Sequence, residues 1–592
     1  MQRLILASRD DGLGERLRAM LNALYLAHRF NLEFGFVWHA LQGSTKELCA
    51  NELAPIIVPA QEEIFTQEFI QKYSFNGQFE DALDEFGRFK RKSIQEFITT
   101  AALNPPYRAT QKRLDTIFND INTQEYKKQM SYLFTQIGFN ETFTKLIEKA
   151  KIKAKNLAKN TQLSVLHIRA GDAIFKKSNQ NGVVRSSIYF RALSFPLAVE
   201  IIKEEIEANN TLLVFSDDLS LLKTLKKDLP VLFGFTQEQN NNLLFSIDLY
   251  ENDELENPAH KAFYENVLMS YADRIYCTKN SGYANLAVLT GKPKEEIIVY
   301  EYFDLQSQYK LTEKYLDKIN AHNFEKVFAC FQAFRLSKEL KMPLELSKTW
   351  LSKALTYDNE NEAYRILWLD CLFLQGKIQE AENMLEKILF ERKQSFLHAL
   401  FSGQPKRYDY SFTFKHYLNH IKPHLPYISF VALQIAWNLG YDDLVYKNLK
   451  DFQSTKNSFI HSLFNTLEKP LMPLGAEYRM KNHLSYRLGE IMVKNSYSIF
   501  GIIKMPFILL QTYLDFKQKR LKACVSLRDY KDYERALKFV KNHAFYKLGF
   551  SLIKAQKTWY KGGYFYFFKE VRKLALEYEK ERKAFKKNSF EG

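Results

Sequence analysis

The strongest constraint on the fold is an alternation of short apolar runs with longer helical patterns, which occurs twice within the first 305 residues. The first apolar run is residues 3–9, and the glycine loop at 11–14 separates it from a helical period over residues 15–30. A second strand is expected at 32–38. Strand, glycine turn, helix and strand together are the opening of a Rossmann-like unit. The residues from 60 to 160 are predicted to be mostly helical.

A second alternation begins at Leu163 and continues to about residue 300. The predicted strands are 163–168, 211–215, 230–234, 275–278 and 297–300, and the predicted helices are 188–208, 219–228, 259–274 and 281–290. We therefore expect an α/β fold class with two Rossmann-like domains, residues 1–160 and 161–310, and a cleft between them. In such sheets ligands bind beyond the carboxyl ends of the parallel strands.

From residue 311 the pattern is wholly helical, so an all-α region is expected to follow the two α/β domains. Residues 311–480 form one predicted helical domain. Within it, residues 350–389 resemble one tetratricopeptide (TPR) helix pair with Gly376 at the turn. A single pair cannot bury its own faces, so neighbouring helices must complete it. A plain helical spacer and a peptide-binding repeat explain this pattern equally well.

The last predicted segment, residues 481–592, has 25 lysines and arginines against 10 acidic residues, a net charge of +15 of the chain's +16. It contains an internal repeat, because YRLGEIMVK at 486–494 recurs as YKLGFSLIK at 546–554. A lysine-flanked apolar and aromatic run follows each copy, at 498–513 and 558–568. These runs suit an interfacial segment on an anionic membrane, and a buried helix pair with a solvated basic face is the alternative. No nucleic-acid-binding module accompanies the charge.

The cysteines and the first residues indicate the cellular compartment. The five cysteines are far apart and form no CxxC pair, which argues against a zinc site or a disulfide framework and fits a reducing environment; they are Cys49, Cys277, Cys330, Cys371 and Cys524. The opening MQRLILASRDDGLGERL has too short an apolar run for a secretory signal. We expect a cytoplasmic protein that is peripheral to the inner face of the cytoplasmic membrane.

Polar residues follow three of the predicted strands of the second domain. The first of these strands carries His167 near its end and is followed by Arg169 and Asp172, while Ser216-Asp217-Asp218 follow the second and Asn280-Ser281 the third. A guanidinium pairs two oxygens of a diphosphate and stays charged, and the N-terminus of the helix after Ser281 adds backbone donors for the same anion. A carboxylate can accept two N–H bonds from a guanine edge. These groups have the chemistry needed to hold a sugar nucleotide while its diphosphate leaves.

These segments resemble the three motifs of the α1,2-, α1,6- and protein O-fucosyltransferases, which are inverting, metal-independent GT-B enzymes that use GDP-fucose. VLHIRAGDAIF (165–175) is similar to their His-x-Arg-Arg-x-Asp motif, and LLVFSDDLSLLKTL (212–225) to the second. AFYENVLMSYADRIYCTKNSGYANLAVLTGK (262–292) follows the third. DDGLGERLRAMLNALYLA (10–27) is similar to the opening Gly-Leu-Gly-Asn-Gln helix. The resemblance covers residues 1–305.

The resemblance implies roles for individual residues. Arg169 would bind the β-phosphate and stabilise the departing GDP, and His167 would orient the donor. Asp217 or Asp218 would read the guanine, with a slight preference for Asp218. Asn280 and Ser281, with the helix that follows them, would hold the phosphates. Gly12 and Gly14 would let the backbone of the first domain approach the donor closely. No metal or other cofactor is implied.

The chain departs from the family pattern at positions that touch the donor or acceptor pocket. Ala170 replaces the second arginine of the first motif, Glu15 replaces an asparagine, and Gly282-Tyr283 replaces a Thr/Ser-Phe step. The donor can therefore be another GDP-sugar, such as a deoxyheptose or mannose derivative. Asp11, Glu15 and Asp172 are candidates for the general base, and a late proton loss without a dedicated base is the alternative.

Each motif also has a structural explanation. Arg169 and Asp172 can be a strand-end ion pair, and Asp217-Asp218 can cap the next helix. The ordered co-occurrence of the motifs favours a glycosyltransferase that moves fucose or a related sugar, with inversion, onto a surface (capsule) polysaccharide or lipid-linked glycan. A non-catalytic nucleotide-binding and TPR scaffold, or a transferase with a different nucleotide-activated donor, is the alternative.

Overall fold

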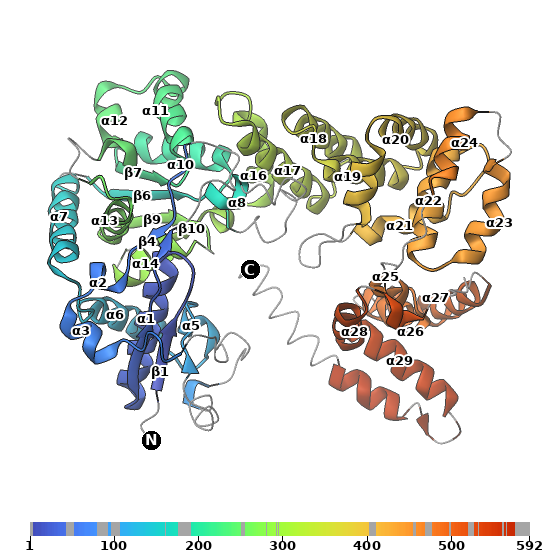
Figure 1. The fold of residues 1–592 in the computed structure, drawn as a ribbon, viewed down its shortest axis with the longest axis horizontal. Coiled ribbons are helices and arrows are strands. Elements are labelled where there is room, and N and C mark those ends of the chain that lie inside the picture. The colour runs from blue at the N-terminus through green and yellow to red at the C-terminus, as the bar shows by residue number, and fades with distance from the viewer. Residues whose placement is uncertain are drawn as a thin grey trace. The chain divides into compact units, whose positions relative to one another are not determined.

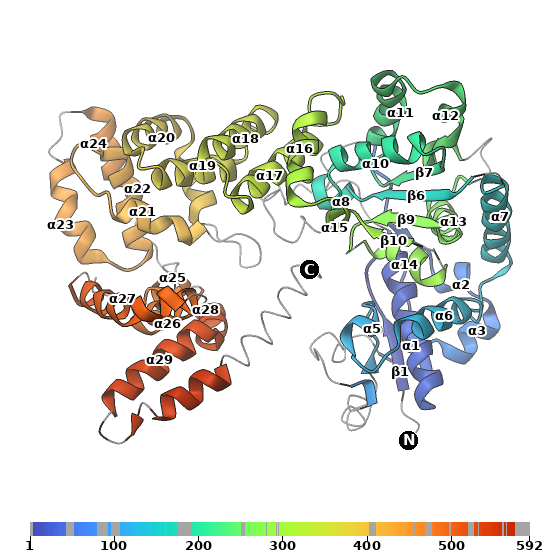
Figure 2. The same cartoon turned by 180° about the vertical axis from the view of Figure 1, so that it is seen from behind.

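The computed structural model divides the chain into two compact units, Met1–Glu360 and Asn361–Gly592 (Figure 1 and, from behind, Figure 2). It describes residues 4–42, 52–79, 93–95, 107–159, 161–175, 191–249, 255–279, 281–291, 293, 295–401, 410–453, 457–467, 476–496, 499–518, 526–530, 532–558, 560, 562–563 and 565–574. Each unit is considered by itself.

The first unit begins with the predicted strand–helix–strand. Strand β1 (Leu4–Ser8) pairs in parallel with β2 (Glu33–Val37) on one side and with β5 (Tyr107–Arg108) on the other. Helix α1 (Leu13–Phe30) connects β1 to β2 and is buried over nearly its whole length. It ends where Asn31 takes a left-handed conformation (φ 52°), a common way to stop a helix. The Rossmann-like opening is therefore present.

Short helices and one small sheet surround these strands. They are β3 (Leu41–Gln42) paired antiparallel with β4 (Ile57–Val58), and α2 (Gln61–Ile64), α3 (Gln67–Tyr73), α5 (Leu114–Ile117), α6 (Thr123–Phe134) and α7 (Glu141–Leu157). The side chains of Asn122 and Asn140 cap α6 and α7 by accepting N–H bonds of 3.0 Å from Glu125 and Phe143. The mostly helical character predicted for 60–160 holds for the described part of that range.

The second sheet has five strands, and every pairing in it is parallel. Its order is β10-β9-β6-β7-β8, with β6 (Leu163–Ile168) in the middle. The other strands are β7 (Thr211–Ser216), β8 (Leu243–Phe245), β9 (Arg274–Cys277) and β10 (Glu295–Ile298). The helices between them are α8 (Gly171–Phe175), α10 (Phe195–Glu207), α11 (Leu219–Phe233), α12 (Gln237–Asn242), α13 (Pro258–Ser270) and α14 (Gly282–Thr290). The mixed α/β class with parallel sheets is thus confirmed.

The predicted strand at 230–234 is wrong, because these residues extend α11. The helical spacing of Leu221, Leu225 and Leu229, all fully or almost fully buried, continues into this apolar run, while Val231 is 85% exposed and cannot belong to a core strand. Gly234, with φ 64°, ends the helix. The next strand along the chain after α11 is β8, which begins at Leu243. Likewise, residues 299–302 form the short helix α15 (Val299–Tyr302) rather than the end of a strand.

Three further helices, which lie mostly in the range predicted to be helical from residue 311, are part of the first unit. They are α16 (Leu305–Tyr315), α17 (Asn323–Glu339) and α18 (Leu344–Tyr357). The Lys314 ammonium of α16 forms a 3.0 Å ion pair with Glu200 of α10, and the Tyr315 hydroxyl donates to the same carboxylate. These bonds attach α16 to the second sheet, so the boundary between units falls at 360/361.

The second unit is helical throughout its described residues. It begins with α19 (Glu362–Leu374), α20 (Ile378–Phe401), α21 (Phe414–Leu418), α22 (Pro426–Asn438), α23 (Asp442–Gln453) and α24 (Ser458–Asn465). Gly376, with φ 71°, makes the tight turn between α19 and α20, as expected for the predicted helix pair. The first residues of the predicted 350–389 pair lie on α18, in the other unit. The TPR assignment stays a prediction.

The basic C-terminal segment completes this unit. It contains α25 (Ala476–Lys481), α26 (Leu484–Asn495), α27 (Ile499–Gln518), α28 (Tyr533–Asn542) and α29 (Ala544–Lys557). The two copies of the repeat lie on α26 and α29, which pack against each other. Among the described residues, no helix combines the length and apolar character that crossing a bilayer requires.

Candidate functional site

The carboxyl end of β6 places three charged or polar side chains at one edge of the second sheet. All six residues of β6 are buried, which fixes the position of His167 on the strand and of Arg169 directly after it. The chain then turns into α8, whose first turn carries Asp172. Because β7 and β9 run parallel to β6, the residues after these strands lie at the same edge.

Arg169 is held between two carboxylates. Its guanidinium forms ion pairs with Asp172, three residues on, and with Asp217 at the end of β7. Asp217 also accepts a 2.8 Å hydrogen bond from the backbone N–H of Ala170. Gly171 between them has φ 25°, and a Cβ atom there would overlap the Asp217 carboxylate. The glycine of the motif is therefore required for the ion pair, which orients Arg169 at the strand end.

The adjacent aspartates have different environments, and the slight preference for Asp218 as a ligand contact is not supported. Asp218 is fully buried, and its Oδ1 accepts bonds from the Leu221 N–H (3.0 Å) and the Ser220 hydroxyl (2.7 Å). It is the helix cap that the alternative interpretation anticipated. Asp217 faces the pocket, but its carboxylate is already bound by the Arg169 guanidinium and the Ala170 N–H.

His167 is neutral at physiological pH. Burial, assisted by the nearby Arg169 charge, lowers the pKa of His167 to about 3. Its Nδ1 lies 3.2 Å from the Ser281 hydroxyl, which itself accepts a 3.4 Å bond from the Ala284 N–H. The tautomer of the neutral imidazole sets which of Nδ1 and the Ser281 hydroxyl donates in this hydrogen bond.

The N-termini of α1 and α14 meet at this edge of the sheet. A Cβ atom at Gly14 would lie 2.8 Å from the carbonyl oxygen of Gly282, and one at Gly282 would overlap the Glu15 carboxylate. Gly14 therefore permits contact between the two halves of the first unit. At Gly12 a Cβ would meet only Ile56, at an ordinary 3.7 Å. Ser281 caps α14, and Asn280 lies outside the described residues.

Glu15 is the acidic residue of the first turn of α1, and it faces the same pocket. It forms a 3.2 Å ion pair with Arg18, one turn further along the helix. Burial is the largest influence on the carboxyl group, and it raises the pKa of Glu15 above the usual range in spite of Arg18. Asp11, another base candidate, pairs with Arg9 at 2.5 Å.

Arg191 also lines the pocket, and sequence reasoning missed it because a helix was predicted from residue 188. Helix α10 begins at Phe195, which the Ser194-Phe195-Pro196 start of the helix indicates. The Arg191 carbonyl accepts a 2.9 Å bond from Thr278 Oγ1, and the Leu193 N–H donates to the Arg169 carbonyl at 2.9 Å. Within the described ranges, the exposed Arg191 guanidinium has no hydrogen bond or ion pair.

One cavity of about 320 Å³ joins these groups. A strap from the first half, residues 52–57, closes one side of it: the Ala54 N–H donates to the Asp217 carbonyl at 2.9 Å, and the Leu219 N–H donates to the Glu52 carbonyl at 3.0 Å. The lining residues are Asp11, Gly12, Leu13, Gly14, Glu15, Leu41, Ala54, Pro55, Ile56, Ile57, His167, Arg169, Asp172, Arg191, Phe215, Ser216, Asp217, Ala262, Glu265, Ser281, Gly282 and Tyr283. Two arginines and two helix N-termini border this pocket together with five carboxylates, so the groups that could bind an anion are the guanidinium groups and the N-terminal amides.

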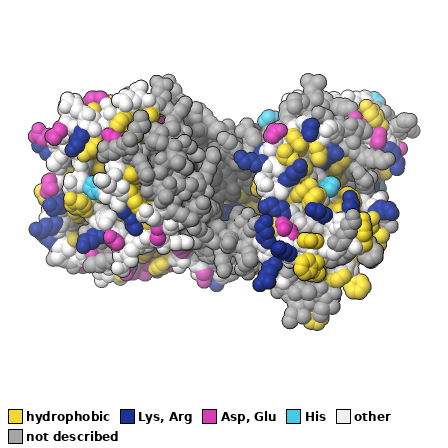
Figure 3. Space-filling model, turned by 90° about the horizontal axis from the view of Figure 1, so that it is seen from below, with side chains coloured by type: hydrophobic (Ala, Val, Ile, Leu, Met, Phe, Trp, Pro, Cys, Tyr) yellow, Lys and Arg dark blue, Asp and Glu magenta, His cyan; other side chains and the backbone are white. Residues whose placement is uncertain are grey.

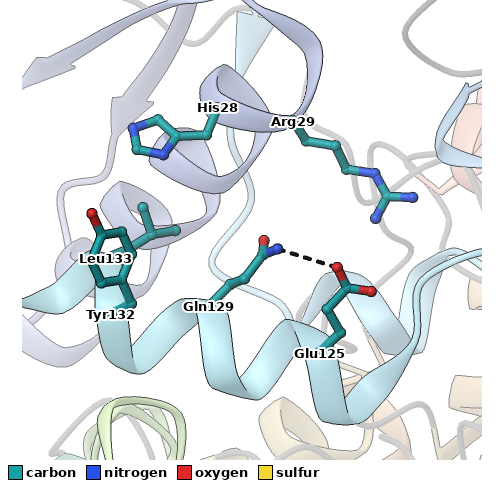
Figure 4. Close-up of a pocket in the computed structure, with 6 residues that line it drawn as sticks. All are labelled: His28, Arg29, Glu125, Gln129, Tyr132 and Leu133. Carbon is teal, nitrogen blue, oxygen red and sulfur yellow. Dashed lines mark hydrogen bonds between the residues drawn. The ribbon is translucent and has the colours of Figure 1, made fainter.

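A second cavity, of about 310 Å³, lies between the C-terminal end of α1 and α6 (Figure 4). His28 and Arg29 of α1 stand opposite Glu125 and Gln129 of α6, and Gln129 donates a 3.4 Å bond to Glu125. Both Arg29 and His28 are exposed to solvent. This cavity lies at the far end of α1 from the glycine loop.

The described ranges contain no group of three histidine, cysteine or acidic side chains arranged to hold a metal ion. They do contain three buried free thiols, of which Cys277 is the nearest to the site in sequence, at the end of β9. Burial raises the pKa of the Cys277 thiol above its ordinary value, so it is not a nucleophile at neutral pH.

Comparison with known proteins gives one family and one group of solved structures. A domain of unknown function (DUF8374) matches residues 434–580, which lie within the second unit. No curated protein matches the chain in sequence. The α1,6-fucosyltransferase NodZ soaked with GDP-fucose is similar at 13% identity and a TM-score of 0.27, over 49% of this chain and 93% of NodZ; a further NodZ structure, from Bradyrhizobium, has 11% identity and the same TM-score. POFUT1 in complex with GDP is similar at 9% identity and a TM-score of 0.27, over 50% of this chain and 98% of POFUT1.

Proposed function

We propose that the first unit is a glycosyltransferase that transfers a sugar from a nucleoside-diphosphate donor, with its two Rossmann-like halves arranged as in GT-B enzymes. The observation that carries this proposal is the convergence of Arg169, Arg191 and the N-terminus of α14 on one cavity at the strand ends. These groups are the complement of a diphosphate, because guanidinium groups and helix N-terminal amides both bind phosphate oxygens. The donor we propose is a GDP-sugar, fucose or a related deoxy or mannose-type sugar.

The two arginines have different roles in this proposal. Arg169 is already neutralised by Asp172 and Asp217, so it supplies a fixed guanidinium whose direction is set before the donor arrives. Arg191 forms no hydrogen bond or ion pair with the described residues, and its charge acts only at longer range, on Glu15 and Arg169. Ala170 stands where a second arginine would follow Arg169, and its N–H holds Asp217 instead. Arg191 thus replaces the missing cation from a different loop.

The reaction then follows from the placement of charge. An acceptor hydroxyl oxygen attacks the anomeric carbon from the face opposite the diphosphate, so the configuration inverts. The bond between that carbon and the phosphate oxygen breaks, and the electron pair leaves with GDP. Arg169, Arg191 and the α14 amides stabilise the negative charge that develops on the leaving group. The two arginines supply the charge stabilisation that a divalent metal supplies in other transferases, so we propose a metal-independent reaction.

Glu15 is the base we propose for the acceptor proton. Its raised pKa brings it closer to neutrality, where a general base is most effective. The acceptor we propose is a hydroxyl of a surface polysaccharide or lipid-linked glycan. The competing hypothesis, a non-catalytic nucleotide-binding scaffold, requires only the phosphate site and leaves Glu15 without a role.

A donor panel tests the proposal. Full-length protein is incubated with GDP-, UDP- and CMP-sugars, with and without EDTA, and the released nucleotide is measured by chromatography. We expect GDP release from at least one GDP-sugar, unaffected by EDTA and lost in Arg169→Ala. Arg29→Ala is the matched control, because this exposed arginine lies at the other cavity. If the protein binds a sugar nucleotide but releases no nucleotide from it, even when extracts that contain acceptor glycans are added, the scaffold hypothesis is supported. Release of nucleotide from UDP- or CMP-sugars alone would exclude a GDP-sugar as the donor.

A further inference from the structure

The two copies of the C-terminal repeat form one symmetric module. The similarity between the copies extends over KNHLSYRLG at 481–489 and KNHAFYKLG at 541–549, an offset of sixty residues. His483 and His543 both cap their helices, with Nδ1 accepting from the N–H two residues on, at 3.4 and 3.3 Å. The ring of each histidine also lies near the ring of the equivalent tyrosine in the other copy. The ring centroids of His543 and Tyr486 are 5.5 Å apart, and those of His483 and Tyr546 are 6.4 Å apart.

Glycine sits at the crossing of the two copies. A Cβ atom at Gly489 would overlap the Phe545 carbonyl oxygen, and one at Gly549 would overlap the Ser485 carbonyl oxygen. The two contacts are equivalent by the symmetry of the repeat. In each of them a glycine of one copy contacts the carbonyl of the residue four positions before the glycine of the other copy. Helices approach this closely only where small residues face each other. Helices α26 and α29 therefore bury their facing sides against each other. The lysine-flanked runs that follow them are not needed for this packing.

The first of these runs, helix α27, leaves an apolar stripe uncovered. Phe500, Phe507, Leu510 and Leu514 follow each other at spacings of seven, three and four residues, so they lie on one face. Their exposed fractions are 76%, 75%, 58% and 48%. The charged residues on this helix are Lys504, Asp515 and Lys517. A helix whose apolar face is exposed and whose net charge is positive has the composition of an interfacial anchor.

The second run repeats this arrangement after α29. Phe565, Tyr566 and Phe568 are 74%, 68% and 68% exposed, whereas Phe567 is buried. Lysines and arginines border these aromatic side chains; they are Lys557, Lys569, Arg572 and Lys573. The space-filling view shows hydrophobic side chains standing among Lys and Arg side chains on this part of the molecule (Figure 3, right-hand side).

We propose that residues 476–574 are a membrane-docking module that binds the surface of an anionic bilayer through the α27 stripe and the aromatic segment 565–568. Charge complementarity selects this occupant: the segment from 481 onward has a net charge of +15, which repels a second copy and attracts anionic headgroups. Since the module has an apolar anchor after each copy of the repeat, two weak insertions act together. This assigns a function to most of the region that matches the domain of unknown function.

Vesicle sedimentation of the full-length protein tests this inference. Two kinds of vesicle are compared: phosphatidylcholine alone, and phosphatidylcholine with about one third phosphatidylglycerol. We expect sedimentation with the anionic vesicles, at least tenfold weaker with the neutral ones and weakened again by high salt, because screening removes the headgroup attraction. The double variant Phe507→Ser, Leu514→Ser is expected to reduce binding at least tenfold.

Phe390→Ser is the matched control, because Phe390 is 73% exposed on α20 in the same unit, and it is expected to keep wild-type binding. Equal sedimentation of the double variant and wild type would overturn the inference. So would a dimer in light scattering that the double variant dissociates, together with absence of vesicle binding, since the stripe would then be an interface between copies. GDP binding by the same double variant, measured in parallel, is independent of these outcomes and reports only on the proposed function.

Discussion

Gly14 of α1 and Gly282 of α14 bring two helix N-termini into contact, because a Cβ atom on Gly14 would lie 2.8 Å from the Gly282 carbonyl oxygen. Helix α1 is in the first Rossmann-like half of this unit and α14 is in the second, so the contact joins the two halves at the pocket. Both N-termini carry partial positive charge toward the same space. The anion site thus depends on the way in which the halves are joined.

Gly14→Ala is expected to weaken GDP binding at least tenfold and to lower the melting temperature, because the added methyl group pushes α1 and α14 apart. Arg29→Ala is the control, since this exposed side chain lies at the other end of α1 and at the other cavity. Calorimetry and thermal unfolding measure both effects. Equal behaviour of the two variants would mean that the close approach of the helices is not needed.

Glu15→Gln is expected to lower kcat by about 10²–10⁴-fold, the usual contribution of a general base, while leaving GDP affinity within about twofold. The wild-type rate should fall as the pH drops through the pKa of Glu15, and burial places this acid limb above that of an ordinary carboxylate. The variant should lack that limb. A pH–rate profile with an unchanged acid limb in the variant would assign the base to another group.

Glu325→Gln is expected to stabilise the first unit, increasingly as the pH rises. Glu325 of α17 is fully buried and faces the Asp218 carboxylate, and burial, together with the charge and hydrogen bond of Asp218, raises the pKa of Glu325 well above its usual range. A carboxyl group with a raised folded-state pKa contributes fully below its unfolded pKa of about 4.3, and this contribution is lost as the pH rises towards the folded value.

The neutral amide that the Glu325→Gln substitution introduces avoids that loss and donates to the Asp218 carboxylate. Thermal unfolding between pH 5 and pH 8 measures the effect, with the exposed Glu148→Gln as control. A gain in melting temperature that is the same at both pH values, or a loss at pH 8, would contradict this assignment of the Glu325 proton.

Gly549→Ala is expected to destabilise the second unit by more than about 2 kcal/mol, because the methyl group overlaps the Ser485 carbonyl at the helix crossing. Alanine is intrinsically the better helix former by about 1 kcal/mol. The two effects have opposite signs, so urea unfolding distinguishes them. A stabilised variant would show that α26 and α29 do not cross at this glycine.

The sequence predicted the parts of the fold that local patterns determine. Strand β6 was predicted with its observed bounds, and β7 to within one residue, because an apolar run between polar ends leaves little freedom. The run at 230–234 failed because an apolar pentapeptide is equally compatible with a buried strand and with the last turn of α11.

The site was harder to predict than the strands, because its partners are distant in sequence. The sequence placed Arg169 and Asp217 at adjacent strand ends, but it did not indicate that the two would neutralise each other across Gly171. Arg191 carried no motif, and only the Ser194-Phe195 helix start hinted that it lies in a loop. The Glu325–Asp218 contact joins residues more than a hundred positions apart.

Calorimetric titration of full-length protein with GDP, GMP and guanosine tests the central claim most directly, with wild type, Arg191→Ala and Arg29→Ala. We predict that GDP binds at least tenfold more tightly than GMP, and that Arg191→Ala removes most of this difference, a loss of about 1.4 kcal/mol or more. Arg29→Ala should behave as wild type, and guanosine should bind alike to all three. Equal affinity of Arg191→Ala and wild type for GDP, or no preference for GDP over GMP, would contradict the assignment of this pocket as a diphosphate site.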